Sequence, residues 1–165
     1  MLHSESRLGR VASQISPKAK AVLDVGYDHG QLLAHLAKTR PELKLIGGEV
    51  SPEFKDRFVD HYGPAVADLR TGSGLSVAAP GEVDVVVLAG LTDKTMVRLL
   101  EEGKDHIPHL KQVICCPPAL EVHLRPQLAA LGLKITSETI AFKRHRSYDI
   151  ITSEPGEVTE APHPW

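Results

Sequence analysis

The sequence of 165 residues lacks the residues that would tie it together covalently or hold it in a membrane. Its two cysteines, Cys115 and Cys116, are adjacent, so they cannot link distant segments of the chain. No apolar run reaches the roughly 18 residues of a membrane-spanning helix, and residues 1–18 have no continuous apolar stretch typical of a signal peptide. We therefore expect a reduced, cytoplasmic protein without a membrane partner.

An excess of charge of one sign is missing as well. With 19 Lys and Arg against 21 Asp and Glu, the formal net charge is −2, so an RNA partner would need a local basic patch. The nine histidines show no recurrent ligand spacing and there is no second cysteine pair, so we predict no metal site. The sequence leaves the oligomeric state open.

Apolar strand patterns alternate with helical patterns through most of the chain. The expected strands are residues 21–26, 43–50, 65–70, 82–90, 111–118, 133–142 and 148–154. The expected helices are residues 8–15, 30–40, 51–63, 93–107 and 119–132, the third with Ser51 as its N-cap and the last kinked or shortened by Pro126.

This order of elements predicts the fold class. Five strands separated by helices indicate a doubly wound α/β sheet that is mostly parallel, and the last two strands are joined directly, as in an antiparallel hairpin. We expect one domain over residues 1–154, including an N-terminal helix, and a flexible C-terminal tail over residues 155–165 that is acidic and contains proline.

Unusual residues follow the strands, where ligands bind in such sheets. The first strand ends in Asp24-Val25-Gly26-Tyr27-Asp28-His29-Gly30. In this segment Gly26 allows a tight turn and Gly30 allows the next helix to pack closely. Glu49 closes the second strand, where an acid can accept hydrogen bonds from ribose hydroxyls. Glycines after strands are common in α/β proteins, so this pattern alone supports a nucleotide site weakly.

The departure from the dinucleotide fingerprint indicates which cofactor the turn would suit. Asp28 occupies the position of the second glycine of G-x-G-x-x-G, and a carboxylate there repels a pyrophosphate. S-adenosylmethionine has no phosphate and carries a cationic sulfonium and an ammonium group. The acidic turn therefore favours S-adenosylmethionine over a dinucleotide.

The same residues resemble those of a known family. LDVGYDHGQLL is similar to the D-I-G-S-D-H-A-Y-L-P signature of the TrmK-type bacterial tRNA (adenine-N1)-methyltransferases, and the similarity continues through GGEVSPEF, RTGSGLSVAAPGEVDVVVLAG and SYDIITSE. The resemblance implies a class I, Rossmann-like methyltransferase fold with seven strands. It also implies methyl transfer from S-adenosylmethionine to N1 of adenine 22 in tRNA.

The resemblance also assigns roles to individual residues. It implies that the loop beside the methionine end of the cofactor is formed by Gly26, Tyr27, Asp28 and His29, and that the ribose is held by Glu49 and Val50. It further implies that the adenine of the cofactor is contacted by Gly72, Ser73 and Gly74, and that the floor of the methyl-transfer site is formed by Ala89 and Gly90. Asp24 belongs to the same cofactor segment. Asp28 is the candidate catalytic residue, because its carboxylate could orient the adenine amino group and stabilise the charge that develops on the ring.

Some segments differ from the family pattern on the substrate side. After Ala89-Gly90 the family has M-G-G, whereas residues 91–93 of this chain are Leu-Thr-Asp. Where the family has L-Q-P-N, residues 115–118 of this chain are Cys-Cys-Pro-Pro. We also expect a short form without the family's helical C-terminal extension. These differences leave open a methyltransferase with a different or smaller substrate, or a non-catalytic relative that binds S-adenosylmethionine.

A basic cluster at residues 142–147 is the candidate contact for tRNA. Arg144 and Arg146 could bind phosphates, and Tyr148 could stack on a base. The sequence favours an ordinary solvated hairpin turn slightly over this role, and Tyr148 also suits an ordinary strand position. A second basic patch would form if the N-terminal helix lay nearby, from Arg7, Arg10, Lys18 and Lys20.

Overall fold

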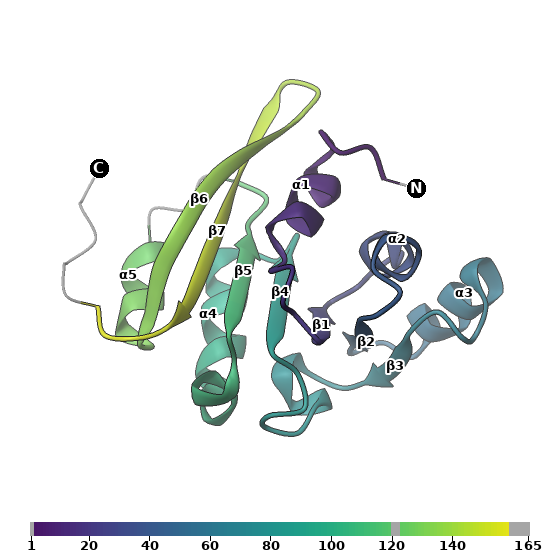
Figure 1. Cartoon of the computed structure of the whole chain (residues 1–165), viewed down its shortest axis with the longest axis horizontal. Coiled ribbons are helices and arrows are strands. Elements are labelled where there is room, and N and C mark those ends of the chain that lie inside the picture. Colours follow the sequence, from purple (N-terminus) through teal and green to yellow (C-terminus); the bar gives the residue numbers. More distant parts are fainter. Residues whose placement is uncertain (1, 120–122, 159–165) are drawn as a thin grey trace.

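The computed structural model describes residues 2–119 and 123–158, and these form one seven-stranded sheet (Figure 1). The strand order is β3-β2-β1-β4-β5-β7-β6, with β1 to β5 parallel and β7 antiparallel to both of its neighbours. The strands are β1 (Ala21–Val25), β2 (Lys44–Glu49), β3 (Asp68–Thr71), β4 (Val85–Ala89), β5 (Gln112–Cys116), β6 (Leu133–Lys143) and β7 (Arg146–Pro155).

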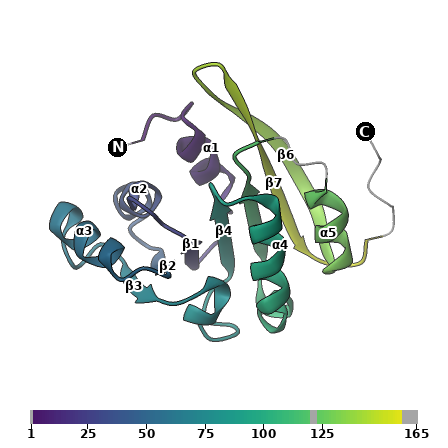
Figure 2. The same ribbon diagram turned by 180° about the vertical axis from the view of Figure 1, so that it is seen from behind.

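Helices cover the two faces of the sheet. The helices are α1 (Arg7–Gln14), α2 (Gln31–Thr39), α3 (Glu53–Tyr62), α4 (Asp93–Glu102) and α5 (Leu124–Ala130), with 3-10 turns at Gly74–Val77 and Lys104–His109. The first three lie on one face and the last two on the other, as Figures 1 and 2 show from opposite sides. Because strand residues alternate between faces, Cys115 packs in the α4–α5 core and its neighbour Cys116 in the α1–α3 core.

The strand order reverses at β1 and β4, and this position sets the place of the site. β1 is buried along its whole length and pairs with β2 on one side and β4 on the other. Because β1 to β5 are parallel, the segments that follow them leave from the same edge of the sheet. The chain diverges between β1 and β4, which opens a crevice at that edge.

The predicted doubly wound fold with an antiparallel terminal strand is confirmed. Some expected boundaries are wrong. The helix expected over residues 93–107 ends at Glu102, and Gly103 leads into the 3-10 turn Lys104–His109. Ser51 does not cap α3, since Pro52 takes the N-cap position and the helix begins at Glu53.

The C-terminal part also differs in detail. Helix α5 begins at Leu124 and places Pro126 in its first turn, where the missing N–H costs no intrahelical bond. Pro155 belongs to β7 and so does not open a tail. The rest of the expected tail lies partly beyond the described residues. Among the described residues, no helix combines the length and apolarity that crossing a bilayer requires.

We predict that Gly47→Ala destabilises the fold by about 1–3 kcal/mol, the usual range for overpacking a core. A Cβ at Gly47 in β2 would lie 2.7 Å from Tyr27 Cδ1 and 2.8 Å from Leu33 Cδ1. Urea denaturation measures the change. Gly156→Ala is the control, because its Cβ would meet its nearest neighbour at 3.8 Å; equal stability of the two variants would contradict the prediction.

Candidate functional site

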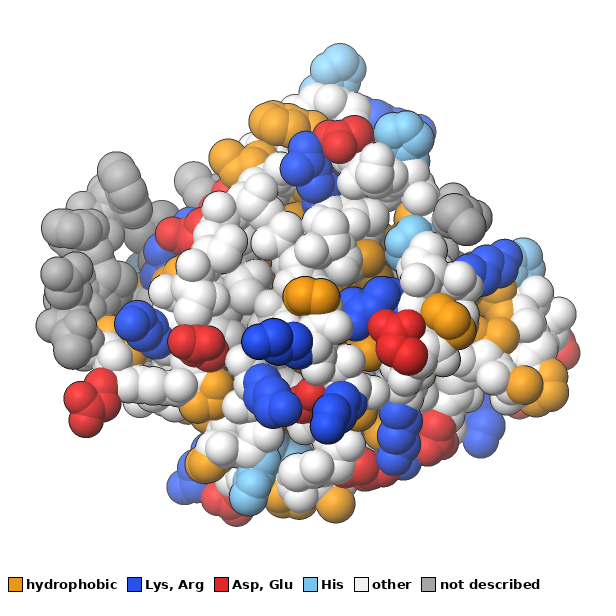
Figure 3. Space-filling model, in the orientation of Figure 1, with side chains coloured by type: hydrophobic (Ala, Val, Ile, Leu, Met, Phe, Trp, Pro, Cys, Tyr) orange, Lys and Arg blue, Asp and Glu red, His pale blue; other side chains and the backbone are white. Residues whose placement is uncertain are grey.

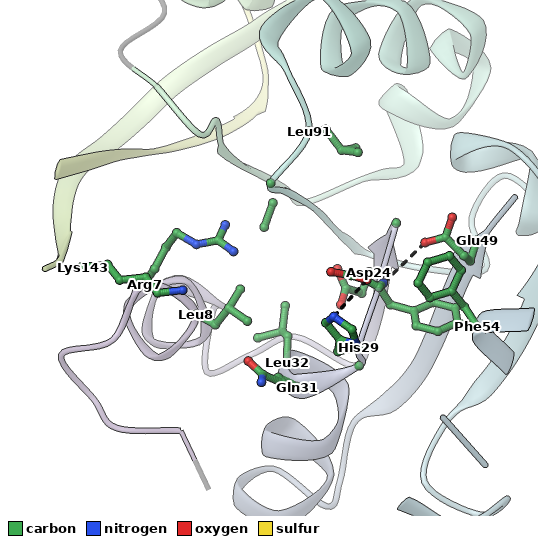
Figure 4. A pocket seen from close by; sticks show the side chains of 16 residues that line it. Arg7, Leu8, Asp24, His29, Gln31, Leu32, Glu49, Phe54, Leu91 and Lys143 are labelled. Atoms are coloured by element: carbon green, nitrogen blue, oxygen red, sulfur yellow. Dashed lines mark hydrogen bonds and ion pairs between the residues drawn. The ribbon is translucent and has the colours of Figure 1, made fainter. Parts of the chain in front are cut away.

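A cavity of about 510 Å³ opens where β1 and β4 diverge (Figure 4). Its size lies within the usual range for small-molecule sites. Segments from β1, β2, β4, the first three helices and the β6–β7 hairpin surround it. The lining residues are Arg7, Leu8, Asp24, Gly26, Tyr27, Asp28, His29, Gly30, Gln31, Leu32, Glu49, Phe54, Ala89, Gly90, Leu91 and Lys143.

The turn after β1 needs its glycines. Gly26 and Gly30 both have φ of 70°, in the left-handed region that favours glycine. A Cβ at Gly30 would lie 2.1 Å from Phe58 Cδ2, so no larger residue fits beneath α3. Asp28 is also left-handed, with φ of 49°, a conformation that Asp tolerates better than most residues. The predicted roles of Gly26 and Gly30 as turn and packing residues agree with this geometry.

Tyr27 anchors the turn from inside. Its side chain is buried, and its ring meets that of Phe58 edge to face, with centroids 5.9 Å apart. The carbonyl of Tyr27 accepts the N–H of Gly30 at 2.7 Å, which closes the turn. Tyr27 therefore fixes the path of the loop above β1.

Glu49 joins the end of β2 to this turn. One carboxylate oxygen accepts the N–H of Asp28 at 3.4 Å and the other accepts the N–H of Val50 at 3.0 Å. Asp28 itself projects into solvent at the cavity rim, and its Oδ1 lies 3.7 Å from His29 Nε2. The structure thus brings together the predicted Glu49, Asp28 and His29.

Asp24 is the buried acid of the cavity, with 4% of its surface exposed. Burial, together with the charge of Glu49, raises the pKa of its carboxyl to about 7, and the charge of Arg7 opposes part of that rise. A carboxyl held at this pKa ionises more readily when a cation binds beside it. Asp24 therefore favours a cationic ligand group.

Four predicted cofactor residues do not line the cavity. Val50 is 65% exposed, and Gly72, Ser73 and Gly74 continue from β3 at the same edge of the sheet. The N–H of Gly72 donates to the carbonyl of Glu49 at 2.9 Å, so this segment borders the β2 end. Their roles toward the ribose and adenine stay predictions.

The basic cluster lies at the tip of the β6–β7 hairpin, where hydrophobic, basic and histidine side chains gather at the top of Figure 3. Lys143 reaches the cavity rim, and Arg144 and Arg146 are exposed. Tyr148 is half-buried, with its ring centroid 5.5 Å from the Arg7 guanidinium carbon. Its predicted stacking on a base stays a prediction, and its ring contacts an arginine.

The second basic patch does not form as one surface. Arg7 lines the cavity at the carboxyl edge of the sheet, and Arg10 pairs with Glu5 at 2.6 Å. Lys18 and Lys20 precede β1, at the opposite edge. Arg7 therefore belongs to the site by itself.

Several lining residues escaped the sequence reasoning. Gln31 and Leu91 directly follow the glycines of predicted turns, so their position in sequence could have indicated them. Leu8 and Phe54 reach the cavity from α1 and α3. Packing of these two helices against the sheet brings the side chains in, and no local pattern marks them.

Comparisons with known proteins agree with this geometry. Residues 4–151 match a family described as a methyltransferase domain. The chain is 28% identical over 160 residues to the tRNA (adenine(22)-N(1))-methyltransferase of Bacillus subtilis, covering 94% of this chain and 67% of that protein. The crystal structure of the B. subtilis M1A22 tRNA methyltransferase TrmK superposes with a TM-score of 0.82, covering 92% of this chain and 66% of that one.

A further solved structure is similar to this chain in both sequence and fold. It is a candidate tRNA (m1A22) methyltransferase of Streptococcus pneumoniae, crystallised in complex with S-adenosyl-L-methionine. The identity is 30% and the TM-score 0.85, and the match covers 97% of this chain and 76% of that one. The chain therefore belongs to the methyltransferase-domain family, and within it to the TrmK-type tRNA (adenine-N1)-methyltransferases.

Proposed function

We propose that this protein transfers the methyl group of S-adenosylmethionine to N1 of an adenine in tRNA, the adenine 22 named for its relatives. The observation that carries the proposal is the acid-lined cavity at the β1–β4 divergence, closed by a glycine turn with Asp28 in place of a phosphate-binding glycine. A tRNA substrate carries with it the expectation of a cytoplasmic protein.

The residues present fit S-adenosylmethionine. Asp24, Asp28 and Glu49 place three carboxyl groups around the cavity, which suits a ligand with two cationic groups and no phosphate. Each Glu49 oxygen accepts a single backbone N–H, which leaves lone pairs for the ribose hydroxyls. Leu8, Leu32 and Leu91 supply apolar wall.

Methyl transfer to N1 of adenine requires little proton transfer by the protein. S-adenosylmethionine supplies an electrophilic methyl group, and N1 of neutral adenine already has a lone pair. Positioning of the two reactants therefore accounts for most of the required catalysis. Asp28 lies at the cavity rim. From there its carboxylate would stabilise the positive charge that develops on the adenine ring.

The β6–β7 hairpin supports an RNA acceptor. Lys143, Arg144, His145 and Arg146 follow one another at its tip, and Phe142 beside them is 69% exposed. Cationic groups bind phosphates and an exposed aromatic ring can stack on an unpaired base. Lys143 also lines the cavity, so one strand of RNA could contact the tip and the site together.

We predict that Asp28→Asn lowers the rate of methyl transfer to tRNA by about tenfold or more, while the affinity for S-adenosylhomocysteine stays within about threefold. Asn keeps the left-handed turn but removes the charge. Tritiated S-adenosylmethionine, total tRNA and mapping of the label measure rate and target. Asp60→Asn on α3, outside the cavity, is the control. An unchanged rate in Asp28→Asn would remove its catalytic role, and label outside adenine would favour another acceptor.

We predict that Asp24→Asn stabilises the protein in a pH-dependent way. A folded pKa raised to about 7 means that the wild type loses stability as pH rises from about 4 to 7. The variant should therefore match the wild type near pH 4 and exceed it at pH 8, by up to about 4 kcal/mol.

Urea denaturation at several pH values measures this difference. Asp105→Asn, at an exposed site, should show no such pH dependence. Asp24→Asn should also weaken S-adenosylhomocysteine binding, because the ligand ammonium loses a carboxylate partner. A stability difference that is the same at pH 4 and pH 8 would contradict the assignment.

We predict that the double variant Arg144→Glu, Arg146→Glu lowers tRNA affinity by about tenfold or more. The salt dependence of binding should weaken with the lost phosphate contacts, its logarithmic slope falling by about one to two. Filter binding at several salt concentrations measures both. Lys134→Glu at the opposite end of β6 is the control. Unchanged tRNA affinity in the double variant would make the cluster a solvated turn.

A further inference from the structure

A second hollow lies beside the cavity, between the turn after β1 and helix α3. Its volume is about 340 Å³, and it shares Asp28, His29 and Gln31 with the cavity that we assign to the cofactor. The rest of its wall is one side of α3, formed by Arg57, Phe58, His61 and Tyr62. We call this hollow the α3 groove. Methyl transfer within the cavity gives the side chains of its α3 wall no role.

Aromatic rings line the α3 groove. Phe58 is buried, and its ring centroid lies 5.0 Å from that of the half-buried Tyr62. His61 is exposed, and its ring meets Tyr62 edge to face with centroids 4.4 Å apart. Tyr27 packs edge to face on Phe58 and supports it from the turn. Rings that are held by packing and also line a groove suit a nucleobase, because every base has a π face that can stack.

Arg57 supplies a cation beside these rings. It is exposed, and in the part of the chain that the structure describes no carboxylate lies within ion-pair distance of it. Its guanidinium carbon lies 5.6 Å from the ring centroid of Phe54, which lines the cofactor cavity. A guanidinium held over an aromatic ring keeps its N–H donors for a planar or tetrahedral anion. Arg57 can therefore bind a phosphate near the cavity.

The shared wall fixes how the groove and the cavity could be filled together. Figure 4 shows His29 and Phe54 beside Glu49, on the side of the cavity away from Lys143 of the hairpin. An RNA strand that places a base in the cavity must enter and leave it, and the basic hairpin tip lies on one side only. The α3 groove lies on the other side. Asp28 at its inner end repels a phosphate, which places the backbone at the outer end and the base against the rings.

We propose that the α3 groove binds one unpaired nucleotide of the tRNA, close in the strand to the adenine that enters the cavity. Its base stacks on His61 and Tyr62, and its phosphate pairs with Arg57. The proposal rests on the proposed function, which supplies the RNA. A free mononucleotide carries the same base and phosphate, and the experiment distinguishes these two sources.

Removal of single bases from the tRNA tests the stacking. A tRNA with adenine 22 is ligated from synthetic RNA with one abasic nucleotide, at each of the two positions on either side of that adenine. Filter binding to the full chain measures affinity. One position should weaken wild-type binding by about 5- to 100-fold, as expected for the loss of one stacked base. His61→Ala should bind the intact tRNA about fivefold more weakly or worse, and should lose its sensitivity to that position alone.

Arg57→Gln tests the phosphate contact separately. It should lower tRNA affinity by about fivefold or more and reduce the logarithmic salt slope by about one, while its sensitivity to the abasic position remains. Lys55→Gln is the matched control, because Lys55 is an exposed cation of α3 outside the groove. This control should keep the wild-type affinity and slope. All three variants should bind S-adenosylhomocysteine as the wild type does.

The outcomes that would overturn the proposal are distinct. Full abasic sensitivity in His61→Ala would remove the stacking, and unchanged tRNA affinity in Arg57→Gln would remove the phosphate contact. Weaker S-adenosylhomocysteine binding in either variant would make the effect structural. Calorimetric binding of adenosine 5′-monophosphate that depends on Arg57 and leaves tRNA affinity unchanged would assign the groove to a free nucleotide. A wild type that methylates tRNA without a sensitive position would overturn this inference alone, whereas one that neither binds nor methylates tRNA would overturn the proposed function as well.

Discussion

The close packing of the β1–α2 turn against β2 and α3 is the constraint on which the site depends. Phe58 fills the space above Gly30, and Tyr27 fills the space above Gly47, so neither glycine position accepts a side chain. This contact sets the path of the turn before any ligand is present. The path of the turn then sets the position of Asp28 and the hydrogen bond that its N–H donates to Glu49. A small steric condition therefore positions the polar chemistry.

Charge in the cavity is arranged in two regions. The acids Asp24, Asp28 and Glu49 come from the β1 and β2 ends, and the cations Arg7 and Lys143 come from α1 and the hairpin. A cofactor with a cationic centre suits the acidic region, and an anionic group suits the basic one. The same division would let the polyanionic acceptor approach from the hairpin side, where the acids of the turn repel it least.

The residues that differ from the family pattern lie in two different environments, the cavity wall and the core. Leu91 follows Gly90 and lines the cavity, and an added Cβ at Gly26 would meet its side chain at 3.4 Å. Cys115 and Cys116 are both buried core residues, so they offer no polar contact to a base. Recognition of an adenine edge therefore depends on other groups, and the exposed hairpin tip offers cations and an aromatic ring.

The sequence by itself determined the parallel strands, the glycine turn and the acids at the strand ends, because periodicity, turn geometry and the place of Glu49 are local properties. Gly26, Asp28 and Gly30 were readable since the backbone conformation of a turn depends on the residues within it. Only the tertiary structure decided that Arg7 and Lys143 join Asp24 in one cavity, while Lys18 and Lys20 lie at the opposite edge. These residues are separated by many positions, and the packing of α1 and the antiparallel hairpin against the sheet, which no local pattern encodes, brings them together.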